Sequence, residues 1–360
     1  MSKSKSEIVR SFAPGWFASV MGTAVAVIAI YVFQDHIPFA EFWQLFFLSL
    51  SVLMFVIIFI PWILRWFLYF DQVKADLNHP VFGAFYPTMP ISLIIIGLAL
   101  EKAGPLFLSE ETLFPILQFL WMTGSAGIAY FAVTILNINF MKPDVNWGIA
   151  NMGWLIPPVS ALIVPILGGC LSVAYTGTTL GTINLVASLI FLGVGSLLFI
   201  FMMGAVFTRY LFHDLLPSHL APTIWIGIAP TAILTIISVK LADPIILFFG
   251  ASDAVAEGFK IVSKILGLGF WGFAFFWLIL AIIVTAKHHK KIKIPFAMSW
   301  WAFTFPLGSF IVSTGVIHTA VGGSFFLWVG TVSLAAFAFI WSAVSMRTIR
   351  GVISGEIFEG

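Results

Sequence analysis

The stretch "TFPLGSF", Thr304 to Phe310, decides the fold, because its pattern occurs three more times along the chain. The related stretches are "YPTMPISL", "LIPPVSAL" and "IAPTAIL", at residues 86–93, 155–162 and 228–234. Each stretch has a proline inside a long apolar run and a small residue two positions later. The prolines and their small partners are Pro90 with Ser92, Pro158 with Ser160, Pro230 with Ala232, and Pro306 with Gly308.

The distances between these four prolines are 68, 72 and 76 residues, which is the length of one helical hairpin each time. Such a period predicts a chain built from repeated hairpins. The first apolar run has Gly22 and Thr23 at the position where the other copies have proline. Because a proline inside a helix removes a backbone hydrogen bond, we expect the odd-numbered helices to bend at these positions and to surround a narrow axial space.

The composition is that of a membrane protein, with 61% hydrophobic and only 9% charged residues. Roughly 20 apolar residues cross a bilayer as a helix, and ten runs are long enough. No strand periodicity is present, so we predict an all-α polytopic membrane protein with ten transmembrane helices as five hairpins in a pseudo-five-fold arrangement. The odd helices would surround a central pore and the even ones would face lipid. The ten runs lie at about 13–33, 43–69, 81–101, 113–138, 153–174, 184–212, 220–241, 257–287, 295–317 and 324–346.

Positive charges predict the orientation of these spans. Of the 17 Lys and Arg residues, 13 lie on the side of the two termini, and the segment from Lys287 to Lys293 holds four of them. The other side has Lys102, Lys240, Lys260 and Lys264. Cytoplasmic loops are enriched in Lys and Arg, so we expect both termini in the cytoplasm and the chain in the cell membrane. The predicted division is a tail at 1–12, one transmembrane domain at 13–350, and a tail at 351–360.

Several functional classes lack their characteristic residues. Cys170 is the single cysteine, the seven histidines lie at helix ends or in loops, and no zinc-protease or phosphate-loop motif is present. These features predict neither enzymatic activity nor a metal or cofactor site. A net charge of +2 without a basic patch also argues against a nucleic-acid partner. The inner runs contain few ionisable residues, whereas tightly coupled ion transporters usually have them at mid-depth.

An aromatic ring stands directly before the proline in only one of the four copies. The residues at this position are Met89, Pro157, Ala229 and Phe305. If the bends meet on one axis, Phe305 is the residue expected to plug the pore. Phe303 is the rival, since two residues correspond to roughly 200° around a helix.

The same region supplies candidate pore-lining and helix-bend residues. Hydroxyl side chains near the bends are expected to hydrate a passing ion, while small residues and prolines shape the bends. The hydroxyl set is Ser19, Thr23, Ser92, Ser160, Thr231 and Ser309, and the bend set is Gly22, Pro90, Pro158, Pro230, Pro306 and Gly308.

Three stretches resemble the tellurite-resistance/C4-dicarboxylate transporter family. They are "FAPGWFASVMGTA", "HPVFGAFYPTMPI" and "WWAFTFPLGSF", at residues 12–24, 79–91 and 300–310. The family includes a bacterial tellurite-resistance membrane protein, the yeast malic-acid transporter and the slow anion channels of plant guard cells. The resemblance extends over essentially the whole chain in length, number of spans and order of motifs.

This resemblance implies five hairpins, a pore in each protomer of a homotrimer, and passage of small inorganic anions or C4-dicarboxylates such as malate. It also implies a pore-blocking phenylalanine in the ninth span, here Phe305. The pore shows no obvious basic residue. We also do not expect the regulation that the long cytoplasmic extensions of the plant members carry. An alternative is a proton-coupled dicarboxylate transporter with His79 as the proton site. A membrane-embedded enzyme or redox subunit is a third class.

Overall fold

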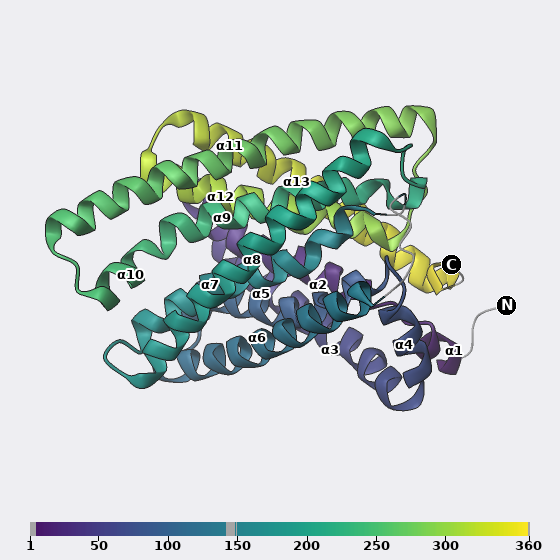
Figure 1. Ribbon diagram of the computed structural model, residues 1–360, viewed down its shortest axis with the longest axis horizontal. Helices are drawn as coiled ribbons and strands as arrows, with labels where there is room; N and C mark the ends of the chain where they lie inside the picture. Colours follow the sequence, from purple (N-terminus) through teal and green to yellow (C-terminus); the bar gives the residue numbers. More distant parts are fainter. Residues whose placement is uncertain (1–4, 142–147, 149, 359–360) are drawn as a thin grey trace.

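The computed structural model describes residues 5–141, 148 and 150–358, which form helices and connecting turns without any strand. The long helices run side by side in one bundle, and the two chain ends lie at the same end of it (Figure 1). Lys3 and Lys142, which were counted for the orientation, lie outside the described residues. The predicted all-α class is therefore confirmed for the described part of the chain.

Ten helical segments in the described part of the chain are long and apolar enough to cross a membrane, as predicted. The odd-numbered spans are buried over 78–94% of their most apolar window, and the even-numbered spans over only 22–39%. The odd spans are Pro14–Tyr31, Gly83–Leu106, Met152–Ala174, Ser218–Lys240 and Met298–Val321. Buried and exposed spans thus alternate along the described part of the chain.

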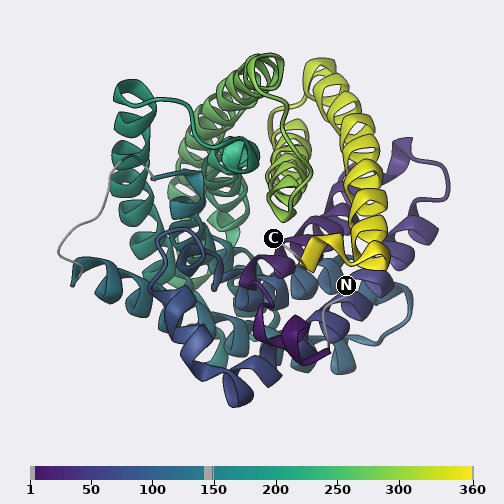
Figure 2. The same ribbon diagram turned by 90° about the vertical axis from the view of Figure 1, so that its right-hand side faces the viewer.

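The α-helices of the odd spans form a closed inner ring. They are α2 (Phe17–Tyr31), α5 (Thr88–Ala103), α7 (Ile156–Ala174), α9 (Ala229–Lys240) and α12 (Thr304–Val321). Each of them packs against the next in chain order, and α12 packs back against α2. Figure 2 views this arrangement from the end that holds the chain termini. These contacts establish the order of the helices around the ring but not their symmetry, so the pseudo-five-fold arrangement stays a prediction.

Each inner helix is covered by the outer helix that follows it in the sequence, which gives the five predicted hairpins. The pairs are α2 with α3, α5 with α6, α7 with α8, α9 with α11, and α12 with α13. The outer helices are α3 (Ala40–Leu68), α6 (Glu110–Phe140), α8 (Thr179–Phe212), α11 (Asp253–Lys291) and α13 (Ser324–Ser354). Three short helices, α1 (Lys5–Arg10), α4 (Phe70–Leu77) and α10 (Ala242–Phe249), lie in the connections and the amino-terminal tail.

The four repeated prolines do not interrupt α-helices, which corrects the predicted mid-helix bends. Pro90, Pro158 and Pro306 are the third residues of α5, α7 and α12, and Pro230 is the second residue of α9. A 3₁₀ segment precedes each of these α-helices within the same span. Proline is well tolerated in the first turn, because its missing N–H would have no partner inside the α-helix there. The prolines therefore mark where the tighter helix changes into the α-helix.

Glycines allow the first and last hairpins to meet and so close the ring. A β-carbon at Gly22 of α2 would collide with the side chain of Thr304, and one at Gly308 of α12 would collide with Val25. Both glycines are buried in the ring. They bring α2 and α12 together more closely than larger side chains would permit.

Candidate pore

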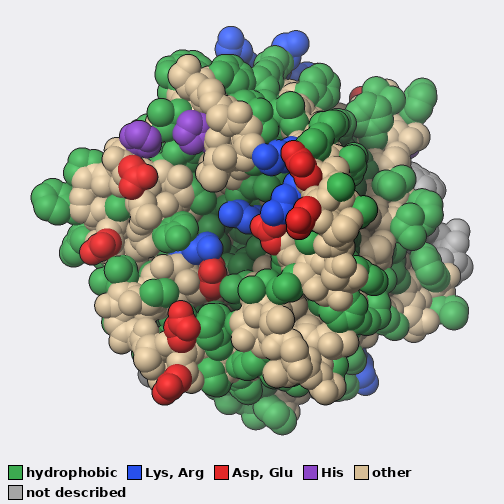
Figure 3. Space-filling model, turned by 90° about the vertical axis from the view of Figure 1, so that its left-hand side faces the viewer, with side chains coloured by type: hydrophobic (Ala, Val, Ile, Leu, Met, Phe, Trp, Pro, Cys, Tyr) green, Lys and Arg blue, Asp and Glu red, His purple; other side chains and the backbone are tan. Residues whose placement is uncertain are grey.

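Two cavities lie inside the ring, and residues of all five inner spans line each of them. The large cavity has a volume of about 720 Å³, and the small cavity about 50 Å³. The large cavity is lined by the carboxyl-terminal parts of the inner helices, and it opens on the face opposite the chain termini. Figure 3 shows this face, with charged side chains around a central hollow.

Phe305 is the one described residue that lines both cavities. It is the second residue of α12, and only 5% of its surface is exposed. The residues around the small cavity come from the beginnings of the inner helices, and those around the large cavity come from further along them. Phe305 is therefore in contact with both spaces.

The rival residue Phe303 faces a different part of the molecule. Its ring packs edge-on against Trp225 at 5.1 Å and against Trp300 at 5.8 Å between centroids. It lines a separate, apolar groove together with residues of the outer helices α11 and α13. The opposite directions of Phe303 and Phe305 agree with the roughly 200° that two helical residues span.

The small cavity is surrounded by the first turns of the inner α-helices. Each helix contributes at least one early residue to its lining, among them Ala18, Thr88, Ile156, Ala229 and Pro306. The hydroxyl of Thr88 is directed at backbone oxygens, since it lies 3.0 Å from the carbonyl of Pro14 and 2.6 Å from that of Phe85. The wall next to Phe305 on this side is therefore largely apolar.

Of the six hydroxyl residues expected to hydrate an ion, Ser309 lines the large cavity, and the others line neither cavity. Those others are buried between helices and donate hydrogen bonds to carbonyls of their own spans. The pairs are Ser19 with Trp16, Thr23 with Ser19, Ser92 with Thr88, Ser160 with Pro157, and Thr231 with Ile228. Five of the six hydroxyl residues therefore lie away from the two cavities, and their role in hydrating an ion stays a prediction.

Most of the predicted bend residues also pack between helices. Pro306 lines the small cavity, whereas Pro90 contacts the outer helix α6 at Gly127, and Pro158 and Pro230 are buried in the ring. Gly22 and Gly308 form the close contacts between α2 and α12 described above. These residues shape the ring, and only Pro306 among them reaches a cavity wall.

His79 lies outside both cavities and caps a turn. Its Nδ1 atom accepts hydrogen bonds from the backbone N–H groups of Val81 and Phe82, both at 3.2 Å. Its ring also packs on Phe82, with 4.6 Å between centroids, and the residue is exposed. This geometry fits a structural cap better than a proton site in the pore.

Charged residues line the outer part of the large cavity, which corrects the expectation of a pore without basic groups. They are Asp35, Glu101, Lys102, Lys240 and Asp243. Lys102 and Lys240 each stand at the end of an apolar run, where a lysine indicates the orientation of a span. Their position at the carboxyl-terminal ends of two inner spans is the sequence signal that they face the pore.

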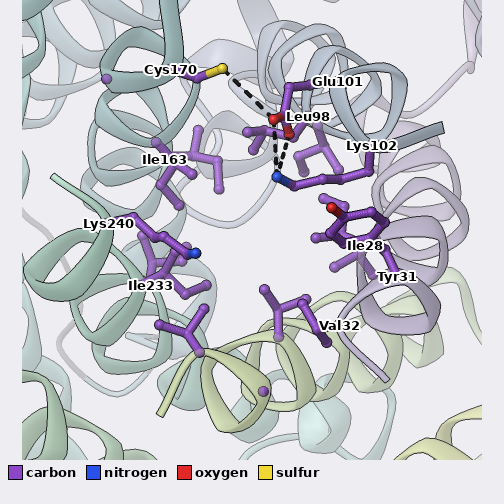
Figure 4. Close-up of a pocket in the computed structure, with 18 of the residues that line it drawn as sticks. Ile28, Tyr31, Val32, Leu98, Glu101, Lys102, Ile163, Cys170, Ile233 and Lys240 are labelled. Atoms are coloured by element: carbon purple, nitrogen blue, oxygen red, sulfur yellow. Dashed lines mark hydrogen bonds and ion pairs between the residues drawn. The ribbon is translucent and has the colours of Figure 1, made fainter. Parts of the chain in front are cut away.

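Glu101 and Lys102 form a cluster that joins three inner helices (Figure 4). Their side chains make an ion pair of 2.8 Å, and the ammonium of Lys102 also lies 5.0 Å from the centroid of the Tyr31 ring on α2. The thiol of Cys170 on α7 lies 3.8 Å from Oε1 of Glu101. Lys240 reaches toward the same cavity from α9, without an acidic partner among the described residues (Figure 4).

Comparisons with known proteins agree with this architecture. The model of the voltage-dependent anion channel family matches residues 11–349. An uncharacterized transporter of Methanocaldococcus jannaschii is 32% identical, over 99% of this chain and 98% of its own length. A sulfite efflux pump of Arthroderma benhamiae is 24% identical, over 98% of this chain and 93% of its own. The described part of the chain has ten helices long and apolar enough to cross a membrane, and the family model matches nearly the whole length. The chain therefore belongs to the voltage-dependent anion channel family.

Proposed function

We propose that this protein is an anion channel or facilitative transporter in which the ring of Phe305 closes the pore of each protomer. The observation that carries the proposal is that Phe305 is the one described residue that lines both cavities. A single large apolar ring at a narrow point excludes water and a hydrated ion, so it acts as a hydrophobic gate. Movement of this ring would connect the two cavities.

The direction of the inner helices supports passage of anions. All five run the same way, because an outer helix returns the chain after each one. Their amino-terminal ends, which carry a partial positive charge, are directed toward the small cavity and the face that holds the chain termini. Among the described residues, none that lines the small cavity is acidic. An anion that passes Phe305 would therefore meet a favourable field on that side.

The transported anions are proposed to be small inorganic anions, with sulfite among them, and C4-dicarboxylates such as malate. One similar protein, from Arthroderma benhamiae, is named a sulfite efflux pump. The large cavity, at about 720 Å³, has room for either kind of anion. Weak binding at several points along such a path favours throughput over accumulation.

The proposed setting is the cell membrane, with both termini in the cytoplasm and three protomers that each have their own pore. The basic segment from Lys287 to Lys293, at the carboxyl-terminal end of α11, supports this orientation. The homotrimer rests on the resemblance to the tellurite-resistance/C4-dicarboxylate transporter family.

The test is anion flux into proteoliposomes, with wild type and Phe305→Ala compared for chloride, nitrate, sulfite and malate. Removal of the ring is expected to raise flux by at least about tenfold, because the hydrophobic constriction is then open. Phe303→Ala is the matched control, and it should leave flux near the wild-type value. Equal flux of wild type and Phe305→Ala, with both proteins correctly inserted, would refute the gate.

A further inference from the structure

The outer part of the large cavity carries several negative charges that repel an anion. The carboxyl-terminal ends of five parallel helices point to this region, and such ends carry a partial negative charge. The carboxylates of Asp35, Glu101 and Asp243 line the same region. The cations among the described lining residues are Lys102 and Lys240. Entry of an anion through this mouth therefore depends on these two ammonium groups.

Two of the three carboxylates at the mouth are held in ion pairs, whereas Asp35 has no ion-pair partner in the described part of the chain. The carboxylate of Asp243 pairs with Lys260 at 2.8 Å, and that of Glu101 pairs with Lys102 at 2.8 Å. Lys240 has no ion-pair partner in the described part of the chain, and its side chain is exposed to the cavity. All three N–H donors of its ammonium are thus available to a ligand.

The two lysines approach the cavity from different directions. Lys102 belongs to α5 and Lys240 to α9, and α7 separates these two helices in the ring. Figure 4 shows both side chains directed into the same space, with Lys102 held in place by Glu101 and by the ring of Tyr31. Two like charges that face one space repel each other, and an anion between them relieves this repulsion.

We propose that Lys240 and Lys102 form an oxyanion-binding site in the large cavity, between its mouth and Phe305. An anion with several oxygen atoms bridges the two ammonium groups, each of which donates to a separate oxygen. A halide has one acceptor centre and contacts both groups less well. The two lysines therefore favour sulfite, nitrate or carboxylates over chloride. This inference deepens the proposed function, because the site lies on the path that Phe305 closes.

The test compares sulfite and chloride flux at increasing concentrations in proteoliposomes made with Lys240→Gln, Lys240→Arg and Lys102→Gln. Lys240→Gln is expected to raise the half-saturating sulfite concentration about tenfold, the effect of losing one hydrogen bond to a charged group. The half-saturating chloride concentration should change much less, and Lys240→Arg should keep most of the sulfite affinity. Lys102→Gln should weaken sulfite affinity at least as much, since it also leaves Glu101 unpaired.

The matched control is Lys264→Gln, which removes one positive charge from the same side of the molecule at an exposed position that lines neither cavity. It should leave both half-saturating concentrations unchanged. If Lys240→Gln raised the half-saturating concentrations of sulfite and chloride equally, Lys240 would act only through the attraction of its charge for any anion. That result would overturn the oxyanion site. Unchanged values for both anions would overturn it as well.

Binding to the purified protein separates the site from the gate. Calorimetric titration of detergent-solubilised protein with sulfite should detect a complex that Lys240→Gln weakens, whatever the state of Phe305. If sulfite binding behaves in this way but Phe305→Ala does not raise flux, the proposed gate is wrong and the site stands. If Phe305→Ala raises flux but sulfite binding is the same in wild type and Lys240→Gln, the gate stands and the site is wrong.

Discussion

The hydroxyl of Ser309 donates a hydrogen bond to the carbonyl oxygen of Phe305, 3.0 Å away and one helical turn earlier. Ser309 lines the large cavity beside the proposed gate, but its proton is already used inside the helix. Only the lone pairs of its oxygen remain for the cavity, and these do not attract an anion. We therefore expect Ser309→Ala to change chloride and sulfite flux by less than about threefold, since one neutral hydrogen bond has a small net effect. A much larger loss in the liposome assay would mean that the hydroxyl contacts the ion.

The size of the side chain at position 305 should set the flux in a graded way. Leucine fills less of the constriction than phenylalanine and alanine fills almost none, so flux should rise from wild type through Phe305→Leu to Phe305→Ala. Phe305→Trp should conduct no better than wild type. Single-channel or liposome recordings of the four proteins test this order. A conductance that does not follow side-chain size would show that gating depends on something other than the ring.

Gly22 should tolerate no side chain, because α2 lies against Thr304 and Trp301 at that point. Overpacking a filled site usually costs about 1–3 kcal/mol, so Gly22→Ala is expected to lower the melting temperature in detergent. The control is Gly193→Ala in the outer helix α8, where the new β-carbon would meet no atom within 4 Å. Gly193→Ala should be as stable as wild type or more so, because alanine is the better helix former. Equal melting of the two variants would contradict the close approach of α2 and α12.

His79 is expected to matter for local stability and not for coupling to protons. Its Nδ1 atom accepts from two backbone N–H groups, and the residue lines neither cavity. His79→Ala should therefore lower the melting temperature slightly and leave the response of anion flux to a pH gradient unchanged. Flux measured at zero voltage with and without a pH gradient checks this. If the pH gradient changes the flux of wild type but not that of His79→Ala, the result would support proton coupling with His79 as the proton site.

Gln118 and Asn184 form two reciprocal amide hydrogen bonds, of 3.0 and 2.8 Å, between the outer helices α6 and α8. Both side chains are buried in an apolar region. Gln118→Leu leaves the amide of Asn184 without this partner, and interhelical bonds in membranes are worth about 0.6–2 kcal/mol. We expect the single variant to melt lower than wild type and the double variant with Asn184→Leu to recover part of the loss. If the double variant melted at a lower temperature than Gln118→Leu, the expected recovery would be absent. The paired amides would then stabilise the fold by more than the cost of burying them.

Long-range features of the fold could be predicted from the sequence, because they depend on hydropathy and on repetition. The ten apolar runs correspond to ten helices, in the described part of the chain, that are long enough to cross a membrane. The spacing from Pro90 to Pro306 identified the inner helix of four of the five hairpins. The conformation around each proline could not be predicted in this way. The hydropathy of an apolar run is the same whether the run forms a 3₁₀ helix or an α-helix. Hydropathy therefore does not show that Pro90 and Pro306 lie in the first turn of an α-helix and not in its middle.

The sequence by itself determined the all-helical class and ten apolar runs long enough to cross a membrane, arranged as hairpins. It also determined that an aromatic ring, Phe305, precedes one repeated proline. Only the tertiary structure decided which side chains reach the axis. The hydroxyl of Thr23 bonds to its own helix and also accepts a hydrogen bond from Trp341, while Lys102 and Lys240, distant in sequence, face one cavity. The physical reason is that the direction in which a side chain points depends on the rotation of its helix about its own axis. Contacts between helices set that rotation, whereas a uniformly apolar helix has no hydropathy pattern that could reveal it.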